Sequence, residues 1–499
     1  MAEQLDALFA SPLIHDLTAE LGDLGRRTRR HPLAMHLAYG AMARIYRSAN
    51  RLDAELLSGD TWQLVLERYN EGAARHPRGV EMPPTTPPLL ADTYRHVRDH
   101  LTQDENLETL QLAFTTHSVA LAQRIGLLVP QGGSRTRPHP RRTIYGDGTV
   151  VRPLYNRAER GRQDPEAQEH ARHDGQIYGN NLVAIAVRGE AVQQRVILAV
   201  GRVQQRGHEA DEAIRLIRQV HAVAGGAIQA VVYDGAFRGI QHEILMSELG
   251  LLVVNKVHAG RRDGDQRVHR QIPLGASRHV VRGRACEHSL VASNGSIHEV
   301  GLDDAGQLVL SGPLRRQQVR RYQRGGGGWR FSLGVVVPCP KGSYVTWISP
   351  HPQVGERGHG RPDQLRLLPE SDPHFQRLYG LRNDSESINR GYKRTLIADR
   401  AAARGWRRQV LDLASWGILT NALAWQTTAL QRQGAEQTMF RDSATKDVSK
   451  SGGRLDTLVG SSRARSSSRS DGSPTQPGPL ASIIRERSLM ASRRMFLND

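Results

Sequence analysis

Residues 379–393 read YGLRNDSESINRGYK and carry Tyr379, Arg382, Glu386 and Lys393 at offsets of three, four and seven. At about 100° per residue, these four side chains fall within about 60° of one another around a helix. One helix stripe therefore carries an aromatic ring, a carboxylate and two cations. Such a face suits a metal ion and a phosphate backbone, although a solvated charged face is the alternative.

This spacing resembles the Y-R-E-K signature of bacterial DDE transposases, the cut-and-paste enzymes of insertion sequences. The resemblance implies that Glu386 is the third metal-binding carboxylate of an RNase H-like core, an α/β fold with a mixed sheet. It also implies that Tyr379, Arg382 and Lys393 contact DNA near the transposon end.

The composition of the chain favours a nucleic-acid partner. The 499 residues leave room for two to four domains, and 38% hydrophobic with 24% charged residues is typical of a soluble globular protein. The formal net charge is +18, and a polyanion gains affinity for such a chain because its condensed counterions are released. Residues 1–130 are slightly acidic, so the positive charge lies downstream.

The two cysteines, Cys286 and Cys339, are too few for a disulfide framework or a C-x-x-C metal site. This favours a reducing compartment. No N-terminal basic-then-apolar signal and no apolar run long enough for a bilayer is found in the sequence. We therefore expect a cytoplasmic protein, and the resemblance makes it bacterial and associated with the nucleoid.

Residues 1–130 are expected to form a helical N-terminal domain. Apolar residues recur there at spacings of three and four, over 33–46, 62–69 and 107–127. Binding of the transposon end is one role for this domain, and a purely structural or dimerising role is the other.

Residues 131–258 are expected to form the first part of the core. Short apolar runs predict strands, and a helix is expected over 209–223 between the third and fourth strand. The order of three strands, helix, strand, helix, strand predicts an α/β layer with a mixed sheet, which is the order of an RNase H-like core. The strands are expected at 143–145, 182–187, 196–203, 228–233 and 251–255.

Residues 259–342 are expected to form an all-β insertion, because the helical period disappears and short apolar runs alternate with Gly-rich turns. The most basic stretch is RRQQVRRYQR, residues 315–324, which predicts a phosphate contact. The resemblance adds Trp329, on which an extruded base would stack; a core tryptophan is the alternative. The arginines expected to contact DNA are Arg315, Arg316, Arg320 and Arg321.

Residues 343–431 are expected to complete the core. A strand is expected at 344–348, the signature helix at 372–403 and a last helix at 407–430. From 432 to 499 the sequence is rich in Ser, Arg and Gly, which predicts a disordered basic tail.

Two aspartates are the expected partners of Glu386. Asp147 lies between two glycines at the end of a predicted strand; a turn formed by Asp147 and Gly148, or a role for Asp174 instead, are the alternatives. Asp234 directly follows the apolar run IQAVVY, and ligands gather beyond the carboxyl ends of strands in open α/β sheets.

The motif around Asp234 departs from the pattern of the family, and Glu386 has a rival on the same helix. The second motif of the resembled family reads Asp, any residue, Gly, then Phe or Tyr, whereas this chain has Gly235 one place earlier and the aromatic Phe237 at the right offset. Asp384 is a rival for Glu386, but it would face about 160° away around the helix.

Three carboxylates from separate elements suffice for two Mg²⁺ ions, or Mn²⁺, which prefer carboxylate oxygen and water. The sequence therefore predicts a DDE transposase that cleaves DNA at transposon ends and transfers the 3′ hydroxyl to target DNA. Its expected partners are the inverted-repeat ends, the target DNA and a second copy of the chain, without a membrane. A nuclease of the same fold and a non-catalytic DNA-binding protein derived from a transposase are the alternatives.

Overall fold

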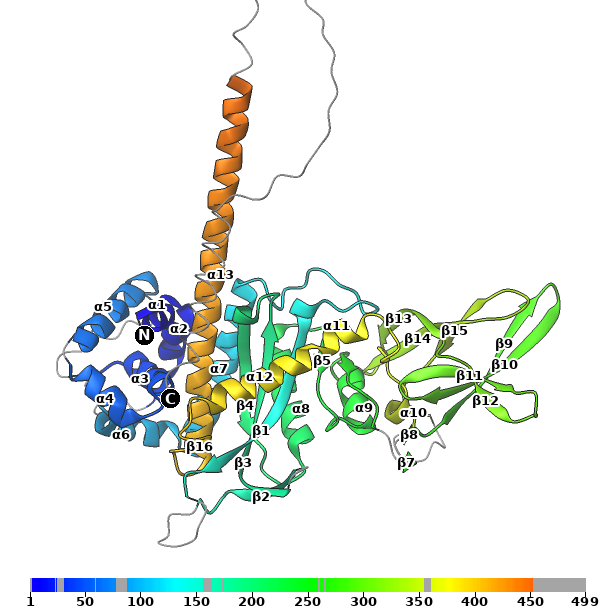
Figure 1. Ribbon diagram of the computed structural model, residues 1–499, viewed down its shortest axis with the longest axis horizontal. Helices are drawn as coiled ribbons and strands as arrows, with labels where there is room; N and C mark the ends of the chain where they lie inside the picture. Colours follow the sequence, from blue (N-terminus) through cyan, green and yellow to red (C-terminus); the bar gives the residue numbers. More distant parts are fainter. Residues whose placement is uncertain are drawn as a thin grey trace, which may run out of the picture. The chain divides into compact units, whose positions relative to one another are not determined.

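Figure 1 shows the protein as a computed structural model. The structure describes residues 2–22, 24, 31–58, 60–77, 88–155, 164–172, 175–258, 261–263, 266–353 and 360–451. Asp174 and most of the predicted tail lie outside these residues. The chain divides into a compact unit, Met1–Ala435, and a second unit, Glu436–Asp499, whose described residues are helical.

A seven-stranded mixed sheet lies at the centre of the first unit. Its main strands follow the order β4-β3-β1-β5-β6, while β2 pairs with β3 and β16 pairs with β1. β3 is antiparallel to its neighbours, and β5, β6 and β16 run in the direction of β1. The strands are β1 (Thr143–Pro153), β2 (Gln168–Arg172), β3 (Gly175–Arg188), β4 (Arg195–Arg202), β5 (Ala230–Val232), β6 (Leu252–Val254) and β16 (Arg400–Ala401).

Two helices connect these strands in the predicted order. α8 (Glu209–Ala224) follows β4, and α9 (Gly239–Ser247) lies between β5 and β6. The predicted mixed α/β pattern is therefore confirmed, with β2 as an addition. Both faces of β3 are buried, since every side chain from Leu182 to Val187 is at most 5% exposed and successive side chains point to opposite faces.

The helices of the N-terminal region join the core through α7. Gln111 Nε2 of α7 donates to Val200 O of β4 over 2.7 Å, and Gln219 Nε2 of α8 donates to Thr115 Oγ1 of α7 over 3.0 Å. α7 is therefore part of the layer that covers the sheet, which the predicted boundary at residue 130 did not anticipate. The helices are α1 (Ala2–Ala10), α2 (Pro12–Leu21), α3 (Leu33–Tyr46), α4 (Ala49–Leu56), α5 (Asp60–Arg75), α6 (Ala91–Leu101) and α7 (Asp104–Arg124).

The last helix, α13 (Trp406–Ser451), packs on the open side of β4. Asn421 Oδ1 accepts from Ile197 N over 2.7 Å, and Asn421 Nδ2 donates to Ile197 O over 2.9 Å and to Ser118 Oγ over 3.0 Å. One side chain thus satisfies backbone groups of β4, whose strand partner in the described residues is β3 alone. The helix continues to Ser451, past the predicted end near residue 430.

The predicted β-rich insertion is all β in its described residues. β7 and β8 form a hairpin, β9 to β12 form one antiparallel sheet, and β13 to β15 form another. β15 differs from the expectation that the core resumes there, because the turn with Gly342 at φ +119 returns the chain to pair with β14. The strands are β7 (Arg261–Asp263), β8 (Gln266–Val268), β9 (Ile272–Val281), β10 (Arg284–Ser293), β11 (Ser296–Leu302), β12 (Leu308–Leu310), β13 (Arg315–Gln323), β14 (Trp329–Val337) and β15 (Tyr344–Ile348).

Short helices replace the single long signature helix that the sequence predicted. α10 (Arg361–Gln364) and α11 (Phe375–Tyr379) precede α12 (Leu381–Lys393), which crosses the sheet against β1 (Figure 1). After α12, Ala398 and Asp399 adopt left-handed φ values of +48 and +59. The turn they make lets β16 pair with β1, and this pairing ends the helix early.

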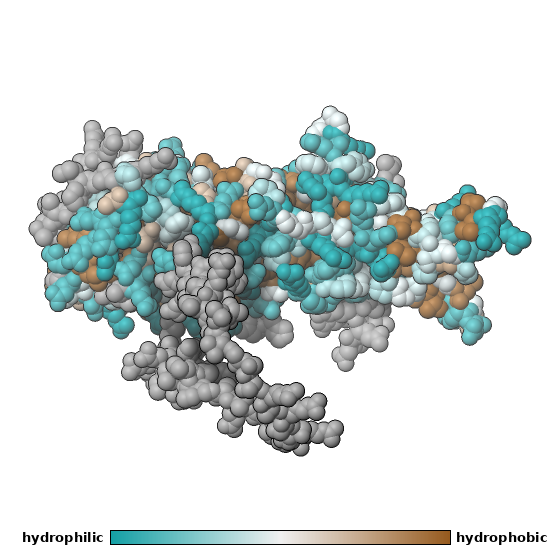
Figure 2. Space-filling view, turned by 90° about the horizontal axis from the view of Figure 1, so that it is seen from above, coloured by the Kyte–Doolittle hydropathy of each residue, from teal (hydrophilic) through white to brown (hydrophobic). Residues whose placement is uncertain are grey.

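Hydrophilic side chains cover most of the described surface in Figure 2, with apolar patches among them. Exposed apolar side chains on the insertion strands include Val280, Leu302 and Leu308. In the part of the chain that the structure describes, no helix has the length and apolar character needed to cross a bilayer.

Candidate functional site

Asp147 lies in the middle of the central strand β1, which continues to Pro153, so the expectation that the strand ends at Asp147 was wrong. Asp147 pairs with Ala184 of β3, so a hairpin turn at Asp147 and Gly148 is excluded. Asp147 Oδ2 accepts from Asn389 Nδ2 of α12 over 3.0 Å, and Asp147 Oδ1 accepts from Gly148 N over 3.0 Å. The strand and the helix together hold this carboxylate in one orientation.

Asp234 follows the neighbouring strand β5, at the carboxyl end where the sequence placed it. Asp234 Oδ1 accepts from Ala236 N over 2.8 Å, which shapes the turn into α9. Behind it, the rings of Tyr233 and Phe237 stack 4.2 Å apart, and Asn255 Nδ2 donates to Phe237 O over 3.0 Å. Buried packing therefore fixes the loop that carries Asp234.

Glu209, the first residue of α8, is a third carboxylate that the sequence analysis missed. Glu209 Oε2 accepts from Asn181 Nδ2 over 2.9 Å, and Glu209 Oε1 accepts from the Tyr233 hydroxyl over 3.2 Å. A Cβ on Gly148 would stand 2.2 Å from Glu209 Oε2, so the glycine after Asp147 leaves room for this carboxylate. Acidic residues are common in first helical turns, so the sequence offered no distinct signal.

The carboxylates repel one another electrostatically. Burial, together with the charges of Asp234 and Glu209, raises the pKa of Asp147 from 3.8 to about 7, while Arg382 opposes this. Burial also raises the pKa of Glu209, and Asp234 adds to the effect, against the hydrogen bonds from Asn181 and Tyr233. The site therefore concentrates negative charge that a cation would relieve.

The predicted stripe on α11 and α12 faces these acids. Glu386 Oε1 lies 2.7 Å from Arg382 Nη1, with the Glu386 side chain 49% exposed. Glu386 and Lys393 line one pocket of about 620 Å³ with Glu209 and Asn389. Burial raises the pKa of Tyr379, which Asp234 raises further, so this ring lies within electrostatic reach of the same cluster.

Asp384, the rival of Glu386, points to the other side of α12 and is 4% exposed. It accepts from Arg195 Nε over 2.8 Å and from Arg188 Nη1 over 3.0 Å, and also from the Tyr145 hydroxyl. Arginines and a tyrosine therefore hold this carboxylate inside the core, and it is unavailable as a metal ligand.

The donor set of the acidic site fits a hard divalent cation, since all of its side chains offer oxygen. In the described part of the chain, no three of these carboxylates bring one oxygen each within 4.8 Å of one another. Glu386 Oε1 is already paired with Arg382 Nη1, so an ion held by Glu386 would compete with this ion pair.

The arginines of β13 divide into two groups. Arg316 Nε lies 2.6 Å from Asp372 Oδ2, and both side chains are at most 8% exposed. Arg321 Nη1 donates to Gly250 O over 2.7 Å. These two arginines join the insertion to the core, which lends no support to their predicted DNA contact. Arg315 and Arg320 are exposed, as a phosphate contact requires.

Trp329 is half-buried at the start of β14. The Arg321 guanidinium lies 3.8 Å from the centre of its ring, and a Cβ on Gly250 would stand 2.9 Å from Trp329 Cγ. This packing matches the alternative of a structural tryptophan, and base stacking remains a prediction.

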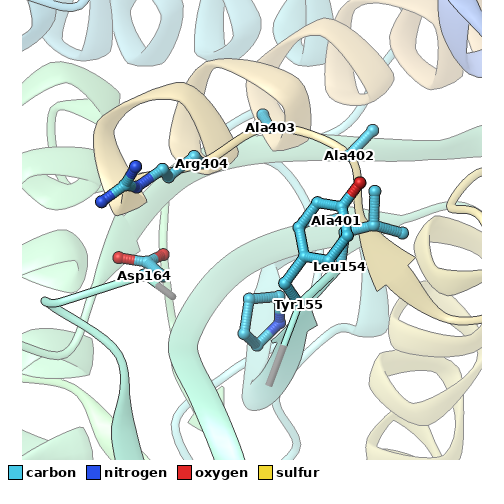
Figure 3. A pocket seen from close by; sticks show the side chains of 8 residues that line it. Leu154, Tyr155, Asp164, Ala401, Ala402, Ala403 and Arg404 are labelled. Atoms are coloured by element: carbon cyan, nitrogen blue, oxygen red, sulfur yellow. The ribbon is translucent and has the colours of Figure 1, made fainter. Parts of the chain in front are cut away.

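A separate pocket near the end of β1 lacks comparable chemistry (Figure 3). Its carboxylate, Asp164, accepts from Asn180 Nδ2 over 2.9 Å and from Gly405 N over 3.2 Å. Asp164 therefore holds the segment that leads into α13. The remaining lining residues are Pro153, Leu154, Tyr155, Ala401, Ala402, Ala403 and Arg404.

No protein-family model matches the chain, and no curated protein matches it.

Asp147→Asn should stabilise the metal-free protein, and this gain should grow by about 2.5 kcal/mol between pH 5 and pH 8. The folded-state pKa of Asp147 is raised from 3.8 to about 7. Below pH 3.8, Asp147 is protonated in both states and does not affect the free energy of unfolding. As the pH rises from 3.8 toward 7, Asp147 increasingly destabilises the folded state, and above pH 7 this destabilisation is constant. Urea denaturation in EDTA at the two pH values measures the difference.

The matched control is Glu190→Gln, which removes a carboxylate that is 87% exposed. Its effect on the free energy of unfolding should be small and similar at both pH values. An Asp147→Asn effect that is equal at pH 5 and pH 8 would contradict the predicted penalty.

Proposed function

We propose that this protein is a DDE transposase that nicks DNA at transposon ends and joins the released 3′ hydroxyl to target DNA. The observation that carries the proposal is that Asp147, Asp234 and Glu209 interact electrostatically, and that Glu209 lines one pocket with Glu386. On this stripe, the carboxylate of Glu386 could bind a metal ion, and the cations could bind the phosphate backbone of DNA.

The strand order supports an RNase H-like core. Asp147 lies on the central strand β1, Asp234 follows the adjacent parallel strand β5, and Glu386 lies on the helix that packs on β1. The all-β insertion separates Asp234 from Glu386 in the sequence, as the resemblance implies. The acids come from separate elements, which is the arrangement that the proposed chemistry needs.

Asp147, Asp234 and Glu386 would hold two Mg²⁺ ions, or Mn²⁺, and Glu209 would lie beside them. When bound, such ions activate the attacking oxygen and stabilise the leaving oxygen of an in-line displacement at phosphorus. Asn389 orients Asp147 through its 3.0 Å hydrogen bond.

The cations around the pocket would contact the DNA backbone. Lys393 lines the pocket together with Arg390 and Arg394, so three positive charges border the space beside Glu386 and Glu209. Arg382, once separated from Glu386, would also be free to contact a phosphate. Tyr379 would hold the terminal nucleotide near Asp234.

The test is incubation of the purified full chain with linear DNA that carries the sequences flanking its own gene, in Mg²⁺ or Mn²⁺. Nicking followed by strand joining supports the transposase. Cleavage without strand joining would indicate a nuclease of the same fold and contradict the proposed transposase. Binding without cleavage in either metal would leave a non-catalytic DNA-binding protein.

The double variant Arg315→Ala with Arg320→Ala should weaken DNA binding and flatten its salt dependence. Each lost phosphate contact should lower the slope of log K against log salt by about 0.9. Titrations with labelled duplex DNA at several salt concentrations measure the slope. Arg218→Ala, which removes an exposed cation paired with Glu248 on the α8 and α9 side, is the matched control. Equal slopes for the double variant and the unmodified protein would rule out a phosphate contact by β13.

A further inference from the structure

We propose that Cys286, His288 and Cys339 form a Zn²⁺ site that joins the two antiparallel sheets of the β insertion. Cys286 and His288 lie on β10, and Cys339 lies in the turn between β14 and β15. One ligand atom from each residue lies within 4.8 Å of the other two. This cluster is separate from the acidic site and takes a different class of metal.

The backbone places the three ligands for a physical reason. Cys286 and His288 are two residues apart on a strand, so their side chains project from the same face of β10. Cys339 approaches that face because the turn after β14 reverses the chain, with Gly342 at φ +119. The sequence contains no C-x-x-C motif, and about fifty residues separate the two cysteines, so spacing could not reveal the site.

The surroundings of His288 suit a metal-binding histidine. Its Nδ1 donates to Glu299 Oε1 over 2.6 Å, and its side chain is 8% exposed. Its Nε2 is buried and has no hydrogen-bond partner in the described structure. A buried polar atom without a partner is costly. Histidines that bind metals typically donate their other ring N–H to a carboxylate, which fixes the tautomer and the ring orientation.

The ligand chemistry selects zinc over magnesium. Two thiolates and one imidazole are borderline-soft donors, whereas Mg²⁺ prefers oxygen. Cys286 and Cys339 are both partly exposed, which leaves a path for the ion. We assign the fourth position to water, because His279, which lies opposite Cys286 in the ladder, is not among the described residues whose ligand atoms lie within 4.8 Å of one another.

A bound ion would reinforce the contact between the two sheets. Ser277 Oγ of β9 donates to Thr346 Oγ1 of β15 over 3.0 Å, and the Tyr344 hydroxyl donates to Ser277 Oγ over 2.9 Å. Metal bonds from β10 to the turn before β15 would hold the same two sheets together. Removal of the ion should therefore loosen the insertion, while the core sheet keeps its structure.

The experiment uses the full chain, purified without added metal and analysed for its elements. We expect one Zn²⁺ per chain. Replacement by Co²⁺ should produce a thiolate-to-cobalt charge-transfer band in the near ultraviolet. Because the chain has two cysteines in all, this band can arise only from Cys286 and Cys339. Limited proteolysis after chelation should cut first within the insertion.

The Zn²⁺ affinity of ligand variants distinguishes a metal site from a chance grouping of side chains. Cys339→Ser and His288→Ala should each lower Zn²⁺ affinity at least 100-fold, as measured by competition with a chromogenic chelator. The matched control is His298→Ala on β11, whose Nδ1 bonds Ser311 O at the surface, and it should keep its zinc. Circular dichroism of the metal-free variants checks that each still folds, and Cys286→Ser replaces either one that does not.

Three outcomes would overturn the proposal. The first is a chain that carries no Zn²⁺ and gives no cobalt–thiolate band. The second is retention of Zn²⁺ by both Cys339→Ser and Cys286→Ser. The third is a disulfide between Cys286 and Cys339 that forms in air while the reduced chain takes up no Zn²⁺. Asp147→Asn should leave the zinc content unchanged, so loss of transposition would not affect this result.

Discussion

Asp234→Asn should lower DNA cleavage and strand joining at least about 10³-fold, which corresponds to about 4 kcal/mol of activation free energy. The substitution keeps the size of the side chain and the hydrogen bond from Ala236 N but removes the negative charge. A site that loses this charge holds a divalent ion less well and offers less stabilisation to the charge that develops at phosphorus. Cleavage of end-bearing duplex DNA in Mg²⁺ measures the effect.

The same loss is expected for Asp147→Asn, Glu209→Gln and Glu386→Gln. Asp147→Asn is the most informative of these, because it should be more stable than the unmodified protein while being inactive. Unfolding could then not explain its loss of activity. Among the four, Glu209→Gln tests the carboxylate that only the structure identified.

Asp211→Asn is the matched control for these four variants. Asp211 lies on the first turn of α8, two residues after Glu209, and its side chain is 63% exposed. It should retain cleavage and joining. Full activity of Asp234→Asn, or equal loss in Asp211→Asn, would contradict the assigned site.

Asp384→Asn should destabilise the protein by about 3–5 kcal/mol, because it leaves the buried Arg195 and the partly buried Arg188 without their shared counter-charge. Asp384 is 4% exposed and accepts from Arg195, Arg188 and Tyr145. Urea denaturation at pH 7 measures the loss. Glu386→Gln on the same helix is the matched control, because its exposed pair with Arg382 should contribute at most about 1 kcal/mol.

The pH dependence of this effect has a definite sign. Burial by itself would raise the pKa of Asp384, but the hydrogen bond and charge of Arg195, with Tyr145 and Arg188, lower the pKa overall. The stabilisation is therefore complete above the unfolded-state pKa and is lost as the pH falls through the folded-state pKa. The gap between the unmodified protein and Asp384→Asn should shrink in acid, and a constant gap would contradict the ion-pair network.

Local patterns were sufficient for much of the fold. Strands over residues 182–187 and 196–203 were predicted from their apolar runs with β-branched residues, and the structure buries the apolar side chains of these runs. The helix over 209–223 was predicted from its spacing and the two glycines that end it. β15 was misplaced, because an apolar run predicts a strand but does not reveal which neighbour completes its hydrogen bonds.

The sequence by itself indicated most of the order of strands and helices, singled out Asp147 and Asp234 as candidate ligands, and placed Arg382, Glu386 and Lys393 on one side of a helix. These follow from periodicity and from residues next to one another in the chain. Only the tertiary structure decided which distant side chains meet. Glu209 fits beside Gly148, the neighbour of Asp147, because Gly148 has no side chain, and Arg316 is paired with Asp372 below the surface. Cys339 comes within reach of His288 because two sheets pack together. These contacts depend on how separate helices and strands pack against one another, and the spacing of residues along the chain does not predict them.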